Sequence, residues 1–153
     1  MLKVMKEKWD KNQNALKERI GELTKKKFNE FDYIDIVKMT FENIFNKDEE
    51  EMLDIKNITE IDNGDYQGTL LYLIPFDTYQ PSEYEYLMTH VSYGSCSGCD
   101  TLQSLQDWSD NDELLTIETQ SDLLGLCRDL IVNTIKPYNG GWRNDNNFET
   151  IEE

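Results

Sequence analysis

Long apolar segments are missing from this chain of 153 residues. No run approaches the roughly 18 consecutive apolar residues that a membrane-spanning helix needs. Charged and apolar side chains alternate over residues 1–9, so this segment lacks the uninterrupted apolar core of a secretory signal. We therefore expect a protein that has no membrane anchor and is not secreted.

Cysteine is also scarce. The three cysteines are an odd number and do not form a disulfide framework, so we expect reduced thiols and a cytoplasmic location. The sequence contains no phosphate-binding Walker loop, no glycine fingerprint for dinucleotides and no His-Glu-x-x-His zinc motif. Acidic residues are abundant, but their pattern identifies no acid–base pair. These absences favour a protein that is not an enzyme.

Negative charge dominates the composition, with 31 Asp and Glu against 15 Lys and Arg and a formal net charge of −16. The charge is uneven, because residues 1–27 carry +5 and residues 28–153 carry −21. One interpretation is a basic helix that lies on an acidic body. The other is an acidic body that faces a basic partner, since such a field speeds association with the opposite charge. Direct binding of the acidic body to DNA or to an anionic membrane is disfavoured.

Two acidic segments are candidates for such a partner-binding surface. Both are expected in solvated loops or turns between the predicted elements. Their acidic residues are Asp48, Glu49, Glu50, Glu51, Asp107, Asp110, Asp112 and Glu113.

Residues 1–27 are predicted to form a basic amphipathic helix. Apolar residues recur in it every seven positions, at Leu2, Trp9, Leu16 and Leu23. Asn12 and Arg19 interrupt the second apolar seam, so we do not expect a long coiled coil. The apolar stripe fits packing onto the rest of the domain, and the alternative is dimerisation or docking to a partner.

A second helix is predicted to begin at Asp32, which can cap it, and to end near Asn46. Strands are predicted over residues 55–61, 66–74 and 84–93. The apolar run in the middle strand suggests burial on both of its faces. A three-stranded antiparallel meander is the simplest arrangement of these strands.

The last third of the chain predicts two more helices. A short one covers residues 101–108, and a longer one begins at Gln120 or Ser121 and stops before Pro137. We therefore predict one α+β domain over residues 1–138, with N-terminal and C-terminal helices packed on the sheet. Residues 139–153 are predicted to be a flexible acidic tail.

The most distinctive motif lies where the third strand is expected to bend into the short helix. We take this junction as a candidate binding site, formed by Tyr93, Gly94, Ser95, Cys96, Ser97, Gly98, Cys99 and Asp100. Glycines permit a sharp turn and serines can bond helix-start amides, so the small residues fit a structural or ligand-holding role. Such a junction can receive an anionic group, although Asp100 already supplies negative charge there.

Two further interpretations concern the Cys-x-x-Cys pair, Cys96 and Cys99. A thiol at a helix start has a lowered pKa, and the local placement resembles that of thioredoxin-like proteins, which allows redox chemistry. Zinc is the other alternative, with His90 and Cys127 completing the four ligands. Because Cys127 lies on the apolar face of the last helix, it is by default a small buried hydrophobe. We therefore expect no cofactor, and zinc remains an alternative.

The segments Gly64-Asp65-Tyr66-Gln67-Gly68-Thr69 and residues 91–103 together resemble a family of small uncharacterised proteins carried mainly by phages. The resemblance covers roughly residues 58–136 and leaves out the basic helix and the acidic tail. It implies an accessory protein that acts in the cytoplasm of a host cell. It brings no established activity, and so no catalytic residues to assign.

These observations favour a non-enzymatic protein that binds a host protein with a basic surface. Mimicry of nucleic acid, to inhibit a defence nuclease or a transcription protein, would fit the acidic body. A thiol-redox or zinc-binding protein is one alternative, and a structural or assembly subunit that uses the helix of residues 1–27 is another. The sequence does not indicate an oligomeric state.

Overall fold

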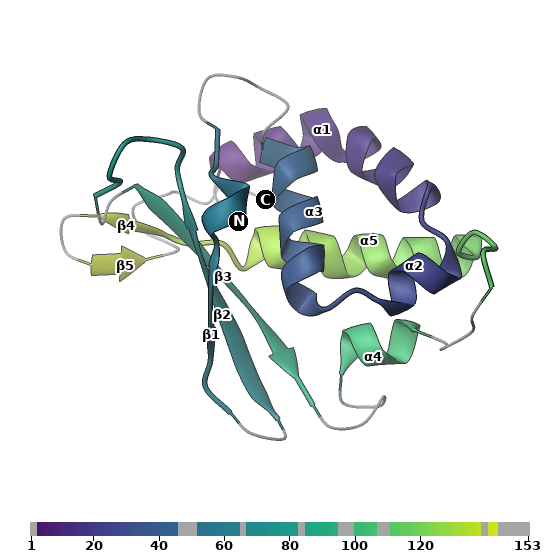
Figure 1. Ribbon diagram of the computed structural model, residues 1–153. Coiled ribbons are helices and arrows are strands. Elements are labelled where there is room, and N and C mark those ends of the chain that lie inside the picture. The colour runs from purple at the N-terminus through teal and green to yellow at the C-terminus, as the bar shows by residue number, and fades with distance from the viewer. Residues whose placement is uncertain are drawn as a thin grey trace.

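The computed structural model describes residues 3–45, 52–64, 67–82, 85–94, 100–106, 111–138 and 141–143. Helices gather on one side of a three-stranded sheet (Figure 1), which confirms the predicted α+β fold. The elements in chain order are α1 (Lys3–Gly21), α2 (Lys25–Asn29), α3 (Tyr33–Phe45), the 3-10 helix η1 (Ile55–Asn57), β1 (Thr59–Asp62), β2 (Gly68–Pro75), β3 (Tyr86–Tyr93), α4 (Thr101–Leu105), α5 (Ile117–Val132), β4 (Lys136–Tyr138) and β5 (Gly141–Arg143).

The strands β1, β2 and β3 form the predicted antiparallel meander, with β2 in the centre. Leu70, Tyr72 and Ile74 alternate along β2 and are buried. Leu71 and Leu73 lie between them and are only half-buried. The helices therefore cover one face of β2 completely, and the opposite face keeps partial contact with solvent.

The apolar stripe of α1 packs inside the domain. Trp9, Leu16 and Leu23 are buried in the core, and α1 contacts α3 and α5. Leu2, the first member of the stripe, lies outside the described residues. Asn12, which interrupts the second seam, is also buried and donates from Nδ2 to the carbonyl of Ile44 at 2.8 Å. The apolar stripe thus packs α1 onto the rest of the domain.

The prediction of one helix over residues 1–27 is wrong, because two helices share this segment. Gly21, a weak helix former, ends α1. Thr24 then caps α2, since its hydroxyl accepts from the Lys27 amide at 3.1 Å. Leu23 stays buried between the two helices, so the apolar spacing continues through the break.

The start of α3 agrees with the prediction to within one residue. Helical residues begin at Tyr33, and the Asp32 amide donates to Asp35 Oδ2 at 2.8 Å. An acidic side chain that reaches back to the amide before the helix is one half of a capping box. This arrangement fixes Asp32 and Tyr33 at the end of α3 that lies nearest α4 (Figure 1).

The last long helix begins earlier than predicted, at Ile117 instead of Gln120 or Ser121. Thr116 is the cap, because its hydroxyl accepts from the Thr119 amide at 3.1 Å. The helix ends at Val132, before Pro137 as predicted. None of the helices in the described ranges combines the length and apolar character that crossing a bilayer requires.

A small hairpin of β4 and β5 follows α5. Ile135, just before it, exchanges two backbone hydrogen bonds with Met88, at 2.8 and 2.9 Å, and so joins the hairpin to β3. Residues 141–143 of the predicted tail therefore form a strand. Residues 139–140 and 144–153 lie outside the described residues, and the flexibility of the tail stays a prediction.

Candidate functional site

The predicted junction is described at its two ends only. Tyr93 ends β3 and Gly94 follows it, and Asp100 precedes α4, as the sequence predicts. The residues between them, Ser95, Cys96, Ser97, Gly98 and Cys99, lie outside the described residues. Asp100 holds the two ends together, because Oδ1 accepts from the Gln103 amide at 3.0 Å and Oδ2 from the Gly94 amide at 3.1 Å. This carboxylate caps α4 and fixes it beside the end of β3.

Tyr33 connects this junction to α3. Its hydroxyl donates to Asp100 Oδ1 at 2.7 Å and accepts from the Leu102 amide at 2.9 Å. The tyrosine is 6% exposed. Burial is the main cause that raises the pKa of this hydroxyl above its usual range; the Leu102 amide opposes the shift and Asp100 reinforces it. Tyr33 therefore keeps its proton and holds α3 and α4 together.

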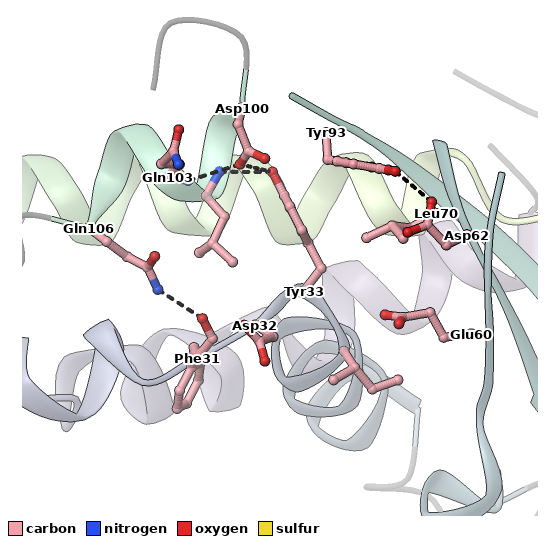
Figure 2. A pocket seen from close by; sticks show the side chains of 12 residues that line it. Phe31, Asp32, Tyr33, Glu60, Asp62, Leu70, Tyr93, Asp100, Gln103 and Gln106 are labelled. Atoms are coloured by element: carbon pink, nitrogen blue, oxygen red, sulfur yellow. Dashed lines mark hydrogen bonds between the residues drawn. The ribbon is translucent and has the colours of Figure 1, made fainter. Parts of the chain in front are cut away.

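A cavity of about 440 Å³ opens between the start of α3, the sheet and α4 (Figure 2). Its volume is within the range of small-molecule and side-chain binding pockets. Four carboxylates line it, from Asp32, Glu60, Asp62 and Asp100. No lysine, arginine or histidine is among its described lining residues. The cavity therefore gathers negative charge in a concave space.

Aromatic rings form part of the same wall. Phe31 and Tyr33 come from the α3 side, and Tyr93 comes from the end of β3. Leu70, on the buried face of β2, also lines the cavity. The lining thus combines carboxylates with flat apolar surface, and both kinds of surface can contact an organic cation.

Tyrosine hydroxyls orient three of the four carboxylates. Besides the Tyr33–Asp100 pair, Tyr93 donates to Asp62 Oδ1 at 2.5 Å, and Tyr72 donates to Glu60 Oε2 at 2.7 Å. Tyr72 is fully buried. Burial, reinforced by the Glu60 hydrogen bond, raises the pKa of the Tyr72 hydroxyl. Each of these phenols therefore acts as a donor that fixes a carboxylate.

Some carboxylate oxygens at the cavity are left without a donor from the described residues. Asp100 uses both of its oxygens, and Asp62 Oδ1 also accepts from the Gly64 amide at 3.0 Å. Among the hydrogen bonds of the described residues, none reaches Asp62 Oδ2, Glu60 Oε1 or the Asp32 carboxylate. In Figure 2 the Glu60 carboxylate points from β1 toward the helices. These oxygens can accept hydrogen bonds from a ligand.

The predicted acidic surface is only partly described. Asp48, Glu49, Glu50, Glu51, Asp107 and Asp110 lie outside the described residues. Asp112 and Glu113 are exposed, and the Glu113 carbonyl accepts from the Lys25 amide at 2.8 Å. The lysine-rich α2 thus lies beside an acidic segment.

The candidate zinc ligands are placed very differently. His90 is exposed on β3. Cys127 is fully buried in α5, and burial raises the pKa of its thiol to about 12. The described ranges contain no group of three or more His, Cys, Asp or Glu placed to hold a metal ion. The thiol and zinc hypotheses therefore depend on Cys96 and Cys99, outside the described residues.

Comparison with known proteins finds no matching family, no matching curated protein and no matching solved structure. Any proposal about function therefore rests on the geometry of the site. Sequence reasoning identified Tyr93 and Asp100 of the cavity but missed Asp32, Glu60 and Asp62 as site residues. A signal for two of them was present, because Glu60 and Asp62 are two positions apart and so share one face of a strand.

Proposed function

We propose that this protein is a non-enzymatic accessory protein of phage type that binds a basic host protein through its acidic surface. The observation that carries the proposal is the cavity, where four carboxylates meet without a basic side chain among the described lining. In a chain of net charge −16, such a site repels anions and attracts cations. The resemblance of residues 64–69 and 91–103 to phage-borne proteins supports action in the host cytoplasm.

The partner that this charge favours is a protein whose basic surface normally meets nucleic acid. Such surfaces neutralise phosphates with lysine and arginine. A rigid body that presents carboxylates can occupy the same surface and exclude the nucleic acid. We therefore propose an inhibitor of a defence nuclease or of a transcription protein.

Affinity capture tests this proposal. The immobilised protein is exposed to a nuclease-treated host lysate at about 0.1 M salt, and bound proteins are eluted with about 1 M salt, which shortens the screening length from about 10 Å to about 3 Å. We expect one or a few basic proteins to be retained at low salt, to be released at high salt and to be displaced by excess duplex DNA.

The result has a matched control. The cavity pair, Glu60→Gln with Asp62→Asn, keeps an acceptor oxygen for Tyr72, Tyr93 and the Gly64 amide. The surface pair, Glu118→Gln with Asp122→Asn, removes the same charge from exposed positions on α5 that do not line the cavity. Capture that ignores both salt and duplex DNA contradicts the proposal.

A further inference from the structure

We infer that the acidic cavity is the anchor point for an arginine side chain of the partner. The inference rests on the proposed function and names the chemical group that this site recognises. Its basis is a concave space of about 440 Å³ that is lined by aromatic residues and by carboxylate oxygens that accept no hydrogen bond from the described residues (Figure 2).

The placement of the carboxylates favours an organic cation over a metal ion. Asp32 lies before α3, whereas Glu60 and Asp62 lie on β1, on the opposite wall. In the described part of the chain, no three side chains of His, Cys, Asp or Glu lie close enough together to share a metal ion. A metal ion draws its ligands to within about 2.0–2.6 Å of one point. Carboxylates spread around a larger cavity instead suit a cation whose charge and donors are themselves spread out.

The guanidinium group of arginine meets this requirement better than the ammonium group of lysine. It is planar and carries five donors in a fixed fork, so it can bond two carboxylates from one position. It also stacks on aromatic rings, and the half-buried Phe31 and Tyr93 are among the aromatic residues that line the cavity. The ammonium group of lysine is a compact charge, so it gains less binding energy from contact with flat aromatic rings.

The tyrosines prepare the site for this ligand. Tyr72 and Tyr93 each hold one oxygen of a β1 carboxylate, which leaves the other oxygen of Glu60 and of Asp62 for the guanidinium group. Carboxylates that are already oriented lose less conformational entropy when a ligand binds. The tyrosines are therefore positioning residues and need not contact the ligand.

A nuclear magnetic resonance titration tests the inference with N-acetyl-arginine amide as the probe. N-acetyl-citrulline amide, which has nearly the same shape without the charge, is the matched neutral probe, and N-acetyl-lysine amide is the charged one. We expect saturable shifts of the Gly94, Leu102 and Gln103 amide signals, with arginine binding most tightly. The affinity should fall about tenfold in the cavity pair, as for the loss of a charge-assisted hydrogen bond, and by less than about twofold in the surface pair.

Several results would overturn the inference. Equal binding of the citrulline probe would show that charge is not recognised, and equal loss in both pairs would show that only the general field matters. If arginine does not bind at the cavity but salt-sensitive capture persists, this inference fails and the proposed function stands. If arginine binds there but no basic partner is captured, the cavity is an arginine site and the proposed function fails.

Discussion

At the scale of single residues, two glutamines on one side of the cavity differ in their hydrogen bonding. Gln106 donates from Nε2 to the carbonyls of Phe28 and Phe31, at 2.8 and 2.9 Å, whereas Gln103 Oε1 is buried without a donor. We predict that Gln106→Met lowers the free energy of unfolding by about 1–3 kcal/mol, because the Phe31 carbonyl loses this donor and the Phe28 carbonyl keeps only the Phe31 amide.

The Gln103→Met variant serves as the comparison. It removes an unsatisfied acceptor, so its stability in urea denaturation should be equal to or above that of the wild type. If Gln103→Met costs as much as Gln106→Met, the Gln103 oxygen has a hydrogen-bond partner in solution.

Asn12 shows why a polar residue sits in an apolar stripe. The sequence suggested only an interruption of the seam, whereas the structure places Asn12 Nδ2 on the carbonyl of Ile44, near the end of α3. We predict that Asn12→Ala destabilises the protein by about 1–3 kcal/mol in urea denaturation, since a buried carbonyl is left without a donor. Asn14→Ala, at an exposed position of the same helix, should change stability by less than about 0.5 kcal/mol.

At the scale of elements, the stripe of α1 belongs to the core of one molecule. Leu16 is 0% exposed, so an acidic substitution there would disrupt the fold and would not report on an assembly. We predict that Leu16→Ala lowers stability by about 2–5 kcal/mol, measured by thermal and urea denaturation. The exposed Glu18→Ala on the same helix should have little effect. A fully stable Leu16→Ala variant would contradict the described packing.

Strong periodic patterns made most elements predictable. The second helix and the meander follow from alternation and from turn residues, and both are present. Residues 55–57, which were predicted to belong to the first strand, form the 3-10 helix η1 instead, and β1 begins at Thr59. The ends of the helices were less predictable where more than one residue can act as the N-cap. Thr24 caps a new helix after Gly21 ends α1. Thr116 caps α5 ahead of residues 120–121, where the sequence pattern predicted the helix to begin. Such a choice depends on which capping hydroxyl the tertiary structure places correctly.

The cavity was predictable only in part, because its residues come from segments far apart in the chain. Tyr93 and Asp100 were identified through the junction. Tyr33 bonds Asp100 across 67 positions, and Tyr93 bonds Asp62 across 31 positions. Hydrogen bonds between residues so far apart in the chain leave no local pattern in the sequence. They form when α3 packs against the sheet.

At the scale of the whole molecule, buried thiol and phenol groups set an alkaline limit on stability. Burial raises the pKa of Cys127 from near 9 to about 12, and burial also raises those of Tyr33 and Tyr72. A raised pKa in the folded state means that the unfolded chain releases protons first. Stability from these groups is therefore complete below about pH 9 and declines as the pH rises toward 12.

We predict that the free energy of unfolding falls steadily between about pH 9 and about pH 11, by up to about 1.4 kcal/mol per pH unit for each buried group that titrates only when unfolded, and that the urea midpoint falls with it. Replacing the thiol in Cys127→Ala should make this decline less steep, although it lowers stability at neutral pH by creating a cavity. A midpoint that stays constant over this range would show that these groups ionise in the folded state.

We propose that the carboxylates of the cavity recognise a basic group of a partner. Isothermal titration calorimetry with an arginine-containing peptide and its citrulline counterpart, on the wild type, the cavity pair and the surface pair, tests it most directly. We expect the arginine peptide to bind the wild type and the surface pair alike, and the citrulline peptide and the cavity pair to give little or no heat. Equal affinity of the cavity pair and the wild type for the arginine peptide would contradict it.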